Sequence, residues 1–200
     1  MWSYANNNAE AIKRISEIYI PTGSLVLDAT FGKGRFWAEL LDAEITVVAQ
    51  DINPALALDV CGDFRRLPFH DQVFDVGVFD PPYYGHGTAI KEQAAASASR
   101  QNVWFVNPEQ EPIRNLYLKG LMELSRVVRN KGIIVVKCTN GCDYSDMPTW
   151  LRGLRIGRVV DEVVCINPAI RNWHGGEKKK LRTAHSYFLV IQNAYYGRIE

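Results

Sequence analysis

The stretch Ser24–Phe36, SLVLDATFGKGRF, decides the fold. Its first half, SLVLDAT, is a short apolar run typical of a buried strand. Gly32 and Gly34 follow it, and glycine lets a backbone turn tightly and approach a ligand closely. The pattern after the turn predicts a helix through about Leu41. A strand, a glycine turn and a helix in this order indicate an α/β sheet that binds a ligand at the carboxyl ends of its strands.

The rest of the chain continues this alternation of strands and helices. Further strands are expected near residues 45–50, 59–61, 73–79, 132–138, 158–166 and 186–192, and helices at 9–18 and 112–129. Strands that alternate with helices predict a mostly parallel sheet with helices on both faces. The last two strands have no helix between them, so we expect an antiparallel pair at one edge.

The composition fits one folded domain that spans residues 1–200. A hydrophobic content of 47% can supply a core, and 22% charged residues with 11% aromatics argue against disorder. No apolar run reaches the length of a membrane span, and the first residues lack the pattern of a secretion signal. Four cysteines are too few for a disulfide scaffold. We therefore expect a soluble, cytoplasmic protein without a metal site.

The glycine turn leaves several ligands open. A phosphate loop needs Ser or Thr after Gly-Lys, whereas Gly34 follows Lys33. A dinucleotide site needs a third glycine where Trp37 stands. An adenosine-type ligand without a pyrophosphate remains, and Asp51, at the end of the next strand, could bind its ribose hydroxyls. A structural corner with a solvated Asp51 is the alternative.

A second motif, Asp80-Pro81-Pro82-Tyr83, follows the strand at 73–79. The prolines stiffen the turn and restrict the residue before them to extended conformations. The Asp80 carboxylate and nearby carbonyls are then held in one direction, which suits an amino group on an aromatic ring. Tyr83 offers a flat face on which a base could stack. The alternative is a turn in which Asp80 only caps backbone groups.

With these motifs the chain resembles the class I S-adenosylmethionine-dependent methyltransferases, and more narrowly the amino-methylating DNA methyltransferase branch. The resemblance rests on Val26-Leu27-Asp28, Phe31-Gly32-Lys33-Gly34, Asp51, Gly62-Asp63-Phe64 and Asp80-Pro81-Pro82-Tyr83. It implies a Rossmann-like, doubly wound α/β fold with seven strands, mostly parallel, and an antiparallel last strand. It also implies S-adenosyl-L-methionine as the cofactor.

The resemblance assigns roles to particular residues. The residues implied at the cofactor are Asp28, Ala29, Thr30, Phe31, Gly32, Gly34, Asp51, Ile52, Asp63, Phe64 and Asp80. Among them, Asp51 would hold the ribose, and Asp63 with Phe64 the adenine. The implied catalytic residues are Asp80, Pro81, Pro82 and Tyr83, of which Asp80 and Pro81 would bind the target amino group.

Two long loops are the candidate nucleic-acid contacts. The loop 84–111, which we expect to be mobile, carries Tyr84 and Trp104 as possible stacking residues. The loop 167–185 carries five basic residues that could contact phosphates, Arg171, Lys178, Lys179, Lys180 and Arg182.

The expected reaction is methyl transfer to the exocyclic amino group of a DNA base, with adenine N6 first. Cytosine N4 in DNA and guanine N2 or adenine N6 in RNA are the alternatives. A non-catalytic module that binds cofactor and nucleic acid is an alternative of another class. A nicotinamide-dependent dehydrogenase would share the glycine turn but leaves the Asp-Pro-Pro-Tyr motif unexplained.

Overall fold

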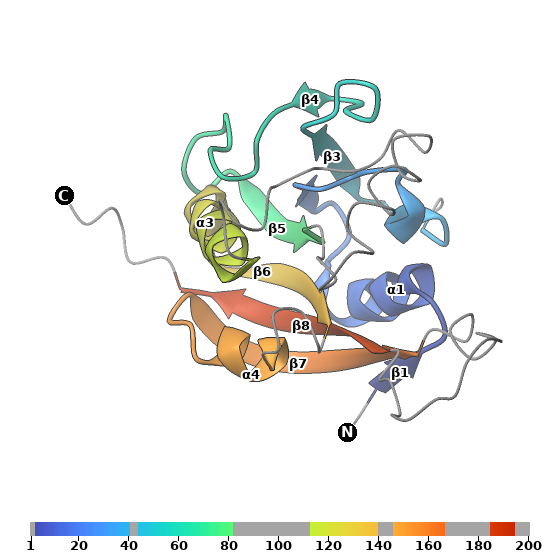
Figure 1. The fold of residues 1–200 in the computed structure, drawn as a ribbon. Helices are drawn as coiled ribbons and strands as arrows, with labels where there is room; N and C mark the ends of the chain where they lie inside the picture. Colours follow the sequence, from blue (N-terminus) through green and yellow to red (C-terminus); the bar gives the residue numbers. More distant parts are fainter. Residues whose placement is uncertain (1–2, 41–43, 82–112, 140–145, 167–184, 195–200) are drawn as a thin grey trace, which may run out of the picture.

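The computed structural model describes residues 3–40, 44–81, 113–139, 146–166 and 185–194 (Figure 1). Its strands are β1 (Ser3–Ala5), β2 (Leu25–Asp28), β3 (Thr46–Asp51), β4 (Val60–Cys61), β5 (Phe74–Phe79), β6 (Val128–Thr139), β7 (Gly157–Ile166) and β8 (His185–Asn193). Its helices are α1 (Asn8–Tyr19), α3 (Ile113–Val127), α4 (Met147–Arg152) and the single 3-10 turn η1 (Arg35–Trp37).

The strands form one sheet of eight in the order β1-β7-β8-β6-β5-β2-β3-β4. The pairs from β4 to β6 are parallel, β8 is antiparallel to both β6 and β7, and β1 is parallel to β7. The mostly parallel, doubly wound sheet with an antiparallel last strand is confirmed. The antiparallel pair does not form the edge, however, because β8 lies between β6 and β7 and the unexpected β1 covers β7. A strand of three residues is too short to leave a pattern in the sequence.

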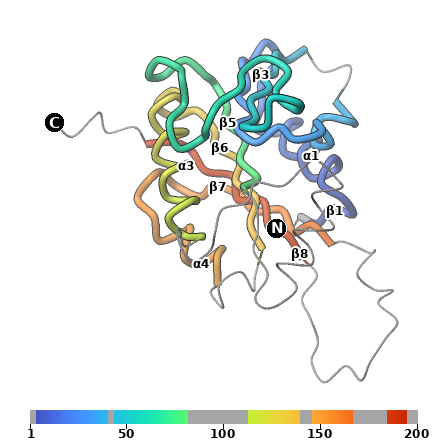
Figure 2. The backbone as a smooth tube through the Cα atoms, turned by 45° about the horizontal axis from the view of Figure 1, so that its top comes forward, coloured from blue at the N-terminus to red at the C-terminus, as the bar shows by residue number. Residues whose placement is uncertain are grey.

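Helices cover both faces of the sheet, as predicted. On one face, Ile12 and Ile15 of α1 pack with Val26 and Val78 of the central strands. On the other face, α3 packs against a cluster that contains Leu27 of β2. Figures 1 and 2 show α1 and α3 on opposite sides of the central strands. The alternation from Val26 to Leu27 sends neighbouring side chains into two separate cores.

Two local predictions need correction. The helix expected after the glycine turn is only the single turn η1. The reason is that Phe36 and Trp37 both pack into the core and that the Trp37 indole N–H donates to the buried carboxylate of Asp28. The short helix α4 was not expected. Asp146 is its N-cap residue, and the Asp146 carboxylate accepts a hydrogen bond from the backbone N–H of Thr149. The helix buries Met147 and Leu151.

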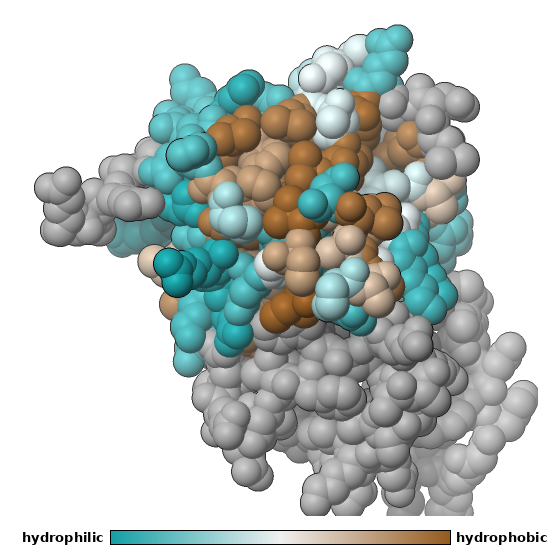
Figure 3. Space-filling model, turned by 90° about the horizontal axis from the view of Figure 1, so that it is seen from above, coloured by the Kyte–Doolittle hydropathy of each residue, from teal (hydrophilic) through white to brown (hydrophobic). Residues whose placement is uncertain are grey.

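The described surface has both apolar and hydrophilic regions. No helix in the described part of the chain is long and apolar enough to cross a membrane. Seen from above the view of Figure 1, apolar residues gather in the middle of one face, with hydrophilic residues around much of them (Figure 3).

Candidate active site

The order of the strands places three carboxylates at one edge of the sheet. The chain runs outward from β2 to β3 and β4, and then returns to β5 on the other side of β2. A ligand crevice is expected where the strand order reverses in this way, outside the carboxyl ends of the strands. Those ends carry Asp28 on β2, Asp51 on β3 and Asp80 directly after β5.

The glycine turn has a conformation that requires glycine. Gly32 and Gly34 have φ angles of 56° and 66°, in the left-handed region. A Cβ on Gly34 would lie 2.6 Å from Cζ of the Phe31 ring, whereas a Cβ on Gly32 would meet nothing closer than the Thr30 carbonyl oxygen at 3.9 Å. Gly34 is therefore needed for internal packing, and Gly32 leaves space open at the turn.

Asp28 is buried beneath this turn, with 2% of its surface exposed. Its carboxylate accepts a hydrogen bond of 2.8 Å from the Trp37 indole N–H and one of 3.1 Å from the backbone N–H of Thr30. Burial raises the pKa of Asp28 to about 7, and the nearby charges of Asp80 and Asp51 act in the same direction, while the two hydrogen bonds oppose them. A positively charged ligand group would favour the ionised form of Asp28.

Asp51 links the turn to β3. One carboxylate oxygen accepts from the backbone N–H of Gly32 at 2.9 Å and the other from that of Asn53 at 2.8 Å. A carboxylate oxygen has two lone pairs, so each can accept a second hydrogen bond. The backbone bonds orient Asp51 without using up its capacity to bind hydroxyl groups.

Asp80 lies against the same turn. Its backbone N–H donates to Thr30 Oγ1 at 2.8 Å, and its side chain accepts an ion-paired hydrogen bond of 2.9 Å from Lys137 Nζ. The Asp80 side chain is 22% exposed. Pro81, the next residue of the motif, is buried. The structure thus brings Asp80 and the glycine turn, 50 residues apart, into one site.

The two residues assigned to adenine have other contacts. The Asp63 carboxylate accepts several hydrogen bonds from Arg65, the shortest 2.6 Å long. The ring of Phe64 is buried and meets the ring of Phe79 edge-on, with 5.0 Å between centroids. Any contact of Phe64 with a ligand would therefore involve its backbone. Ile52, after Asp51, is half-buried.

Several predicted site residues lie outside the described residues. These are Pro82, Tyr83, Tyr84, Trp104, Arg171, Lys178, Lys179, Lys180 and Arg182. The two loops that contain them, 84–111 and 167–185, lie outside as well, apart from His185 at the start of β8.

Sequence reasoning missed two buried polar residues near the site. Lys137, on β6, is 7% exposed and pairs with Asp80. Gln50, before Asp51, is fully buried, and neither polar atom of its side-chain amide has a hydrogen-bond partner among the described residues. The signal for each was present, since a charged or amide side chain interrupts an otherwise apolar strand.

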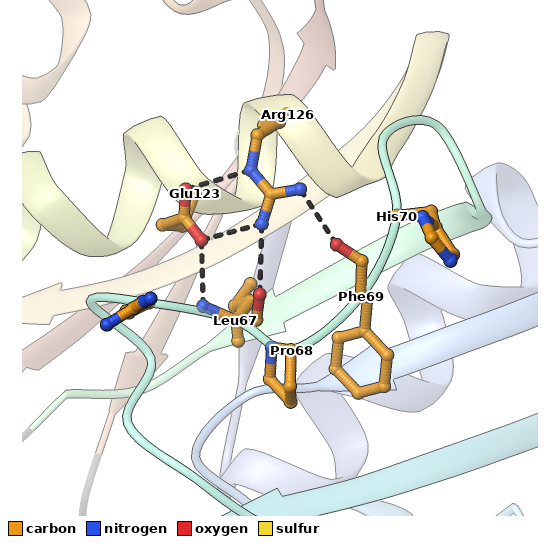
Figure 4. Close-up of a pocket in the computed structure, with 7 residues that line it drawn as sticks. Leu67, Pro68, Phe69, His70, Glu123 and Arg126 are labelled. Carbon is orange, nitrogen blue, oxygen red and sulfur yellow. Dashed lines mark hydrogen bonds and ion pairs between the residues drawn. The ribbon is translucent and has the colours of Figure 1, made fainter.

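A second polar cluster lies away from these carboxylates, where the loop before β5 meets α3 (Figure 4). Arg126 donates to the carboxylates of Glu123 and Asp71 and to the carbonyls of Leu67 and Phe69. Glu123 also accepts from the backbone N–H of Leu67. These contacts attach the loop to α3. We therefore interpret the pocket beside them as a structural feature of this junction.

Comparison with known proteins supports the fold. No protein-family model matches the sequence, and no curated protein matches it. A 1,6-didemethyltoxoflavin-N1-methyltransferase from Burkholderia thailandensis, solved with bound S-adenosylhomocysteine, is similar at a TM-score of 0.58 and 13% identity, over 94% of this chain and 79% of that one.

Two further structures show how varied the proteins of this shape are. The cyclase SpnF is similar at a TM-score of 0.60 and 14% identity, over 93% of this chain and 80% of that one. An rRNA methylase from Streptococcus thermophilus is similar at a TM-score of 0.50 and 14% identity, over 92% of this chain and 94% of that one. At such identities the likeness concerns the fold, and one fold hosts several activities. This chain has the Rossmann-like fold of the class I S-adenosylmethionine-dependent methyltransferases.

Proposed function

We propose that this chain is an S-adenosylmethionine-dependent methyltransferase that acts on the exocyclic amino group of a nucleic-acid base, with adenine N6 in DNA as the first candidate. The observation that carries the proposal is the position of Asp80 against the glycine turn, with its N–H 2.8 Å from Thr30 Oγ1. A carboxylate at this point can accept a hydrogen bond from an amino group while a nucleoside-type ligand occupies the turn.

The described residues fit this cofactor by charge and by shape. Its methionine end carries an ammonium and a sulfonium, and Asp28, Asp51 and Asp80 cluster at the crevice. Gly32 leaves the turn open on the side where a Cβ would otherwise project. Asp51 is held by backbone N–H groups in a fixed orientation, which suits a pair of ribose hydroxyls. When bound, the cofactor supplies a methyl group on a positively charged sulfur, which needs no further activation.

The work left to the protein is positioning and electrostatic stabilisation. Asp80 would accept one N–H of the target amino group and aim its nitrogen toward the turn. The new bond from that nitrogen to the methyl carbon would form as the carbon–sulfur bond breaks, with sulfur keeping the electron pair as a neutral thioether. Positive charge would develop on the nitrogen, which would then release a proton to solvent. The Asp80 carboxylate stabilises this charge from a fixed distance. Pro81 and Pro82 would contribute by keeping the corner rigid.

Nucleic acid is the proposed substrate because of the resemblance at Asp80–Tyr83 and the basic run at 171–182. An aspartate in the first position of this motif favours adenine in the family that the chain resembles. RNA is the second candidate, since an rRNA methylase shares the fold. A base within a duplex would have to be flipped out at a cost of a few kcal/mol, which stacking on Tyr83 would partly offset.

The test is transfer of a tritium-labelled methyl group from S-adenosylmethionine to duplex DNA, single-stranded DNA and total RNA. Nuclease digestion and mass spectrometry would then identify the methylated nucleoside. We expect N6-methyladenine in DNA, and a loss of at least about 100-fold in rate for Asp80→Asn, comparable to the loss of one oriented electrostatic group in other enzymes.

Asp75→Asn is the matched control, because Asp75 lies on the same strand β5 but at its opposite end. This variant should keep the wild-type rate. Equal rates for Asp80→Asn and wild type would show that the carboxylate is not catalytic. Binding of S-adenosylhomocysteine and DNA without any methyl transfer would instead favour the non-catalytic module.

A further inference from the structure

Lys137 is a buried lysine in a strand that otherwise supplies core. It follows Ile134, Val135 and Val136 on β6, each at most 1% exposed, and is itself only 7% exposed. Lysine is almost never buried to this degree unless its ammonium is paired. The parallel register pairs Phe79 with Val136, so Lys137 stands one step further along, beside Asp80.

The contacts of Lys137 fix its position from both faces of the sheet. Its Nζ lies 2.9 Å from Asp80 Oδ2, and the rings of Phe36 and Phe188 lie 5.6 and 6.0 Å from it. Such aromatic faces attract a cation. From α3, the Tyr117 hydroxyl donates to the backbone carbonyl of Lys137 at 2.9 Å. Phe36 belongs to η1, directly after the glycine turn, so the ammonium touches the element that shapes the proposed cofactor site.

The surrounding charges make this pair important for Asp80. Asp28 interacts electrostatically with both Asp80 and Asp51. Beyond Asp80, the charge of Lys137 reaches Cys165 on β7, which also senses Glu10 of α1. Carboxylates at close range repel one another, and a nearby cation offsets that repulsion. Without the ammonium, Asp80 would keep the nearby Asp28 charge but lose the attraction of Lys137.

We propose that Lys137 is a positioning residue for the transfer reaction, one that holds the Asp80 carboxylate in place for the target amino group. The inference rests on the proposed function for its kinetic consequence, but the pairing itself can be tested without any substrate. Lys137 acts through Asp80 and does not need to touch the base or the cofactor.

The first test is the carboxyl-13C signal of Asp80 in protein labelled with carboxyl-13C aspartate, with the Asp80 signal identified by its loss in Asp80→Asn. Lys137→Met should move this signal at neutral pH, since the neutral side chain removes the ion pair from the Asp80 carboxylate. Arg129→Met is the matched control, because Arg129 lies at the other end of β6 and pairs with Asp75. It should leave the Asp80 signal unchanged.

The second test is the single-turnover rate of methyl transfer at saturating cofactor and nucleic acid. We expect Lys137→Met to lower this rate by about 10-fold or more and to change S-adenosylhomocysteine affinity by less than about 3-fold. A merely structural role would weaken S-adenosylhomocysteine binding together with the rate.

The outcomes separate the two proposals. An unchanged Asp80 carboxyl signal in Lys137→Met, or an unchanged rate, would overturn the role of Lys137. A moved Asp80 signal in a protein that methylates no nucleic acid would uphold the pairing and refute the proposed function. Lys137→Gln, which keeps a polar donor but no charge, carries the same tests if the methionine variant does not fold, with the same expected shift.

Discussion

Two ion pairs join β5 to β6, one at each end of the strands, and they differ in burial and in the residues that surround them. At the amino end, Arg129 pairs with Asp75, with side-chain exposures of 56% and 30%. At the carboxyl end, Lys137 pairs with Asp80, with exposures of 9% and 22%. Asp75 also accepts the backbone N–H of Leu25 on β2, so its neighbours are ordinary parts of the sheet. Asp80 has the Asp28 carboxylate and Thr30 beside the glycine turn as neighbours.

The difference shows how a site can be recognised without a ligand. An exposed pair contributes little to stability and needs no function to explain it. A buried cation set against a cluster of carboxylates is costly to build, because each charge loses hydration. Asp28 carries a similar desolvation cost, because burial and neighbouring carboxylates keep it partly protonated near neutral pH. Polar groups assembled at this cost at a strand-order reversal point to ligand binding.

The largest expected effect comes from removing the cation of each ion pair in turn. We expect Lys137→Met to lower the free energy of unfolding by about 3 kcal/mol, because it removes the cation that pairs with a partly buried carboxylate. Arg129→Met should cost about 0–1 kcal/mol, as is usual for exposed pairs. Urea denaturation of both variants measures the two values, and similar losses would show that the pairs do not differ.

The pH dependence of stability tests the cost of Asp28. The pKa of Asp28 is about 7 in the folded protein against an ordinary value of 3.8, so the folded state holds a proton that the unfolded state releases. This contribution to stability is therefore complete at low pH and is lost as pH rises toward 7. Relative to Asp28→Asn, which cannot titrate, wild type should lose about 3 kcal/mol between pH 4.5 and 8. Parallel profiles for the two proteins would contradict the buried, neutral carboxyl.

Much of this arrangement could be predicted from sequence. The apolar runs gave seven of the eight strands, because hydrophobic periodicity is a local property. The partnership of Asp80 with Lys137 is different in kind, since it joins residues 57 apart through strand register. The single turn η1 also carries a contact that no hydrophobic pattern predicts, the hydrogen bond of Trp37 with Asp28 nine residues earlier. Local patterns placed the carboxylates at the edge, and tertiary packing decided which cation faces them.

The two glycines of the turn sharpen the distinction between structure and function within the site itself. Gly34→Ala should lower the free energy of unfolding by about 1–3 kcal/mol, since it meets the Phe31 ring at a left-handed φ. Gly32→Ala should cost about 1 kcal/mol, because only the φ opposes it. If the cofactor lies over the turn, Gly32→Ala should weaken S-adenosylhomocysteine binding by about 10-fold or more, roughly 1.4 kcal/mol. Thermal melting with calorimetric titration measures both effects, and unchanged affinity would move the cofactor away from Gly32.

Gln50 gives the smallest and most local test. Its buried amide has no hydrogen-bond partner in the part of the chain that the structure describes, and a Cβ on Gly62 would lie only 3.4 Å from its Oε1, so the side chain is confined beside the loop assigned to adenine. An unsatisfied buried amide costs about 1 kcal/mol or more, and Gln50→Met keeps a similar volume without that cost. We expect this variant to unfold at a higher temperature than wild type. A lower melting temperature would mean that the amide stabilises the protein without a ligand. The buried polar groups at this edge of the sheet would then not indicate a ligand site.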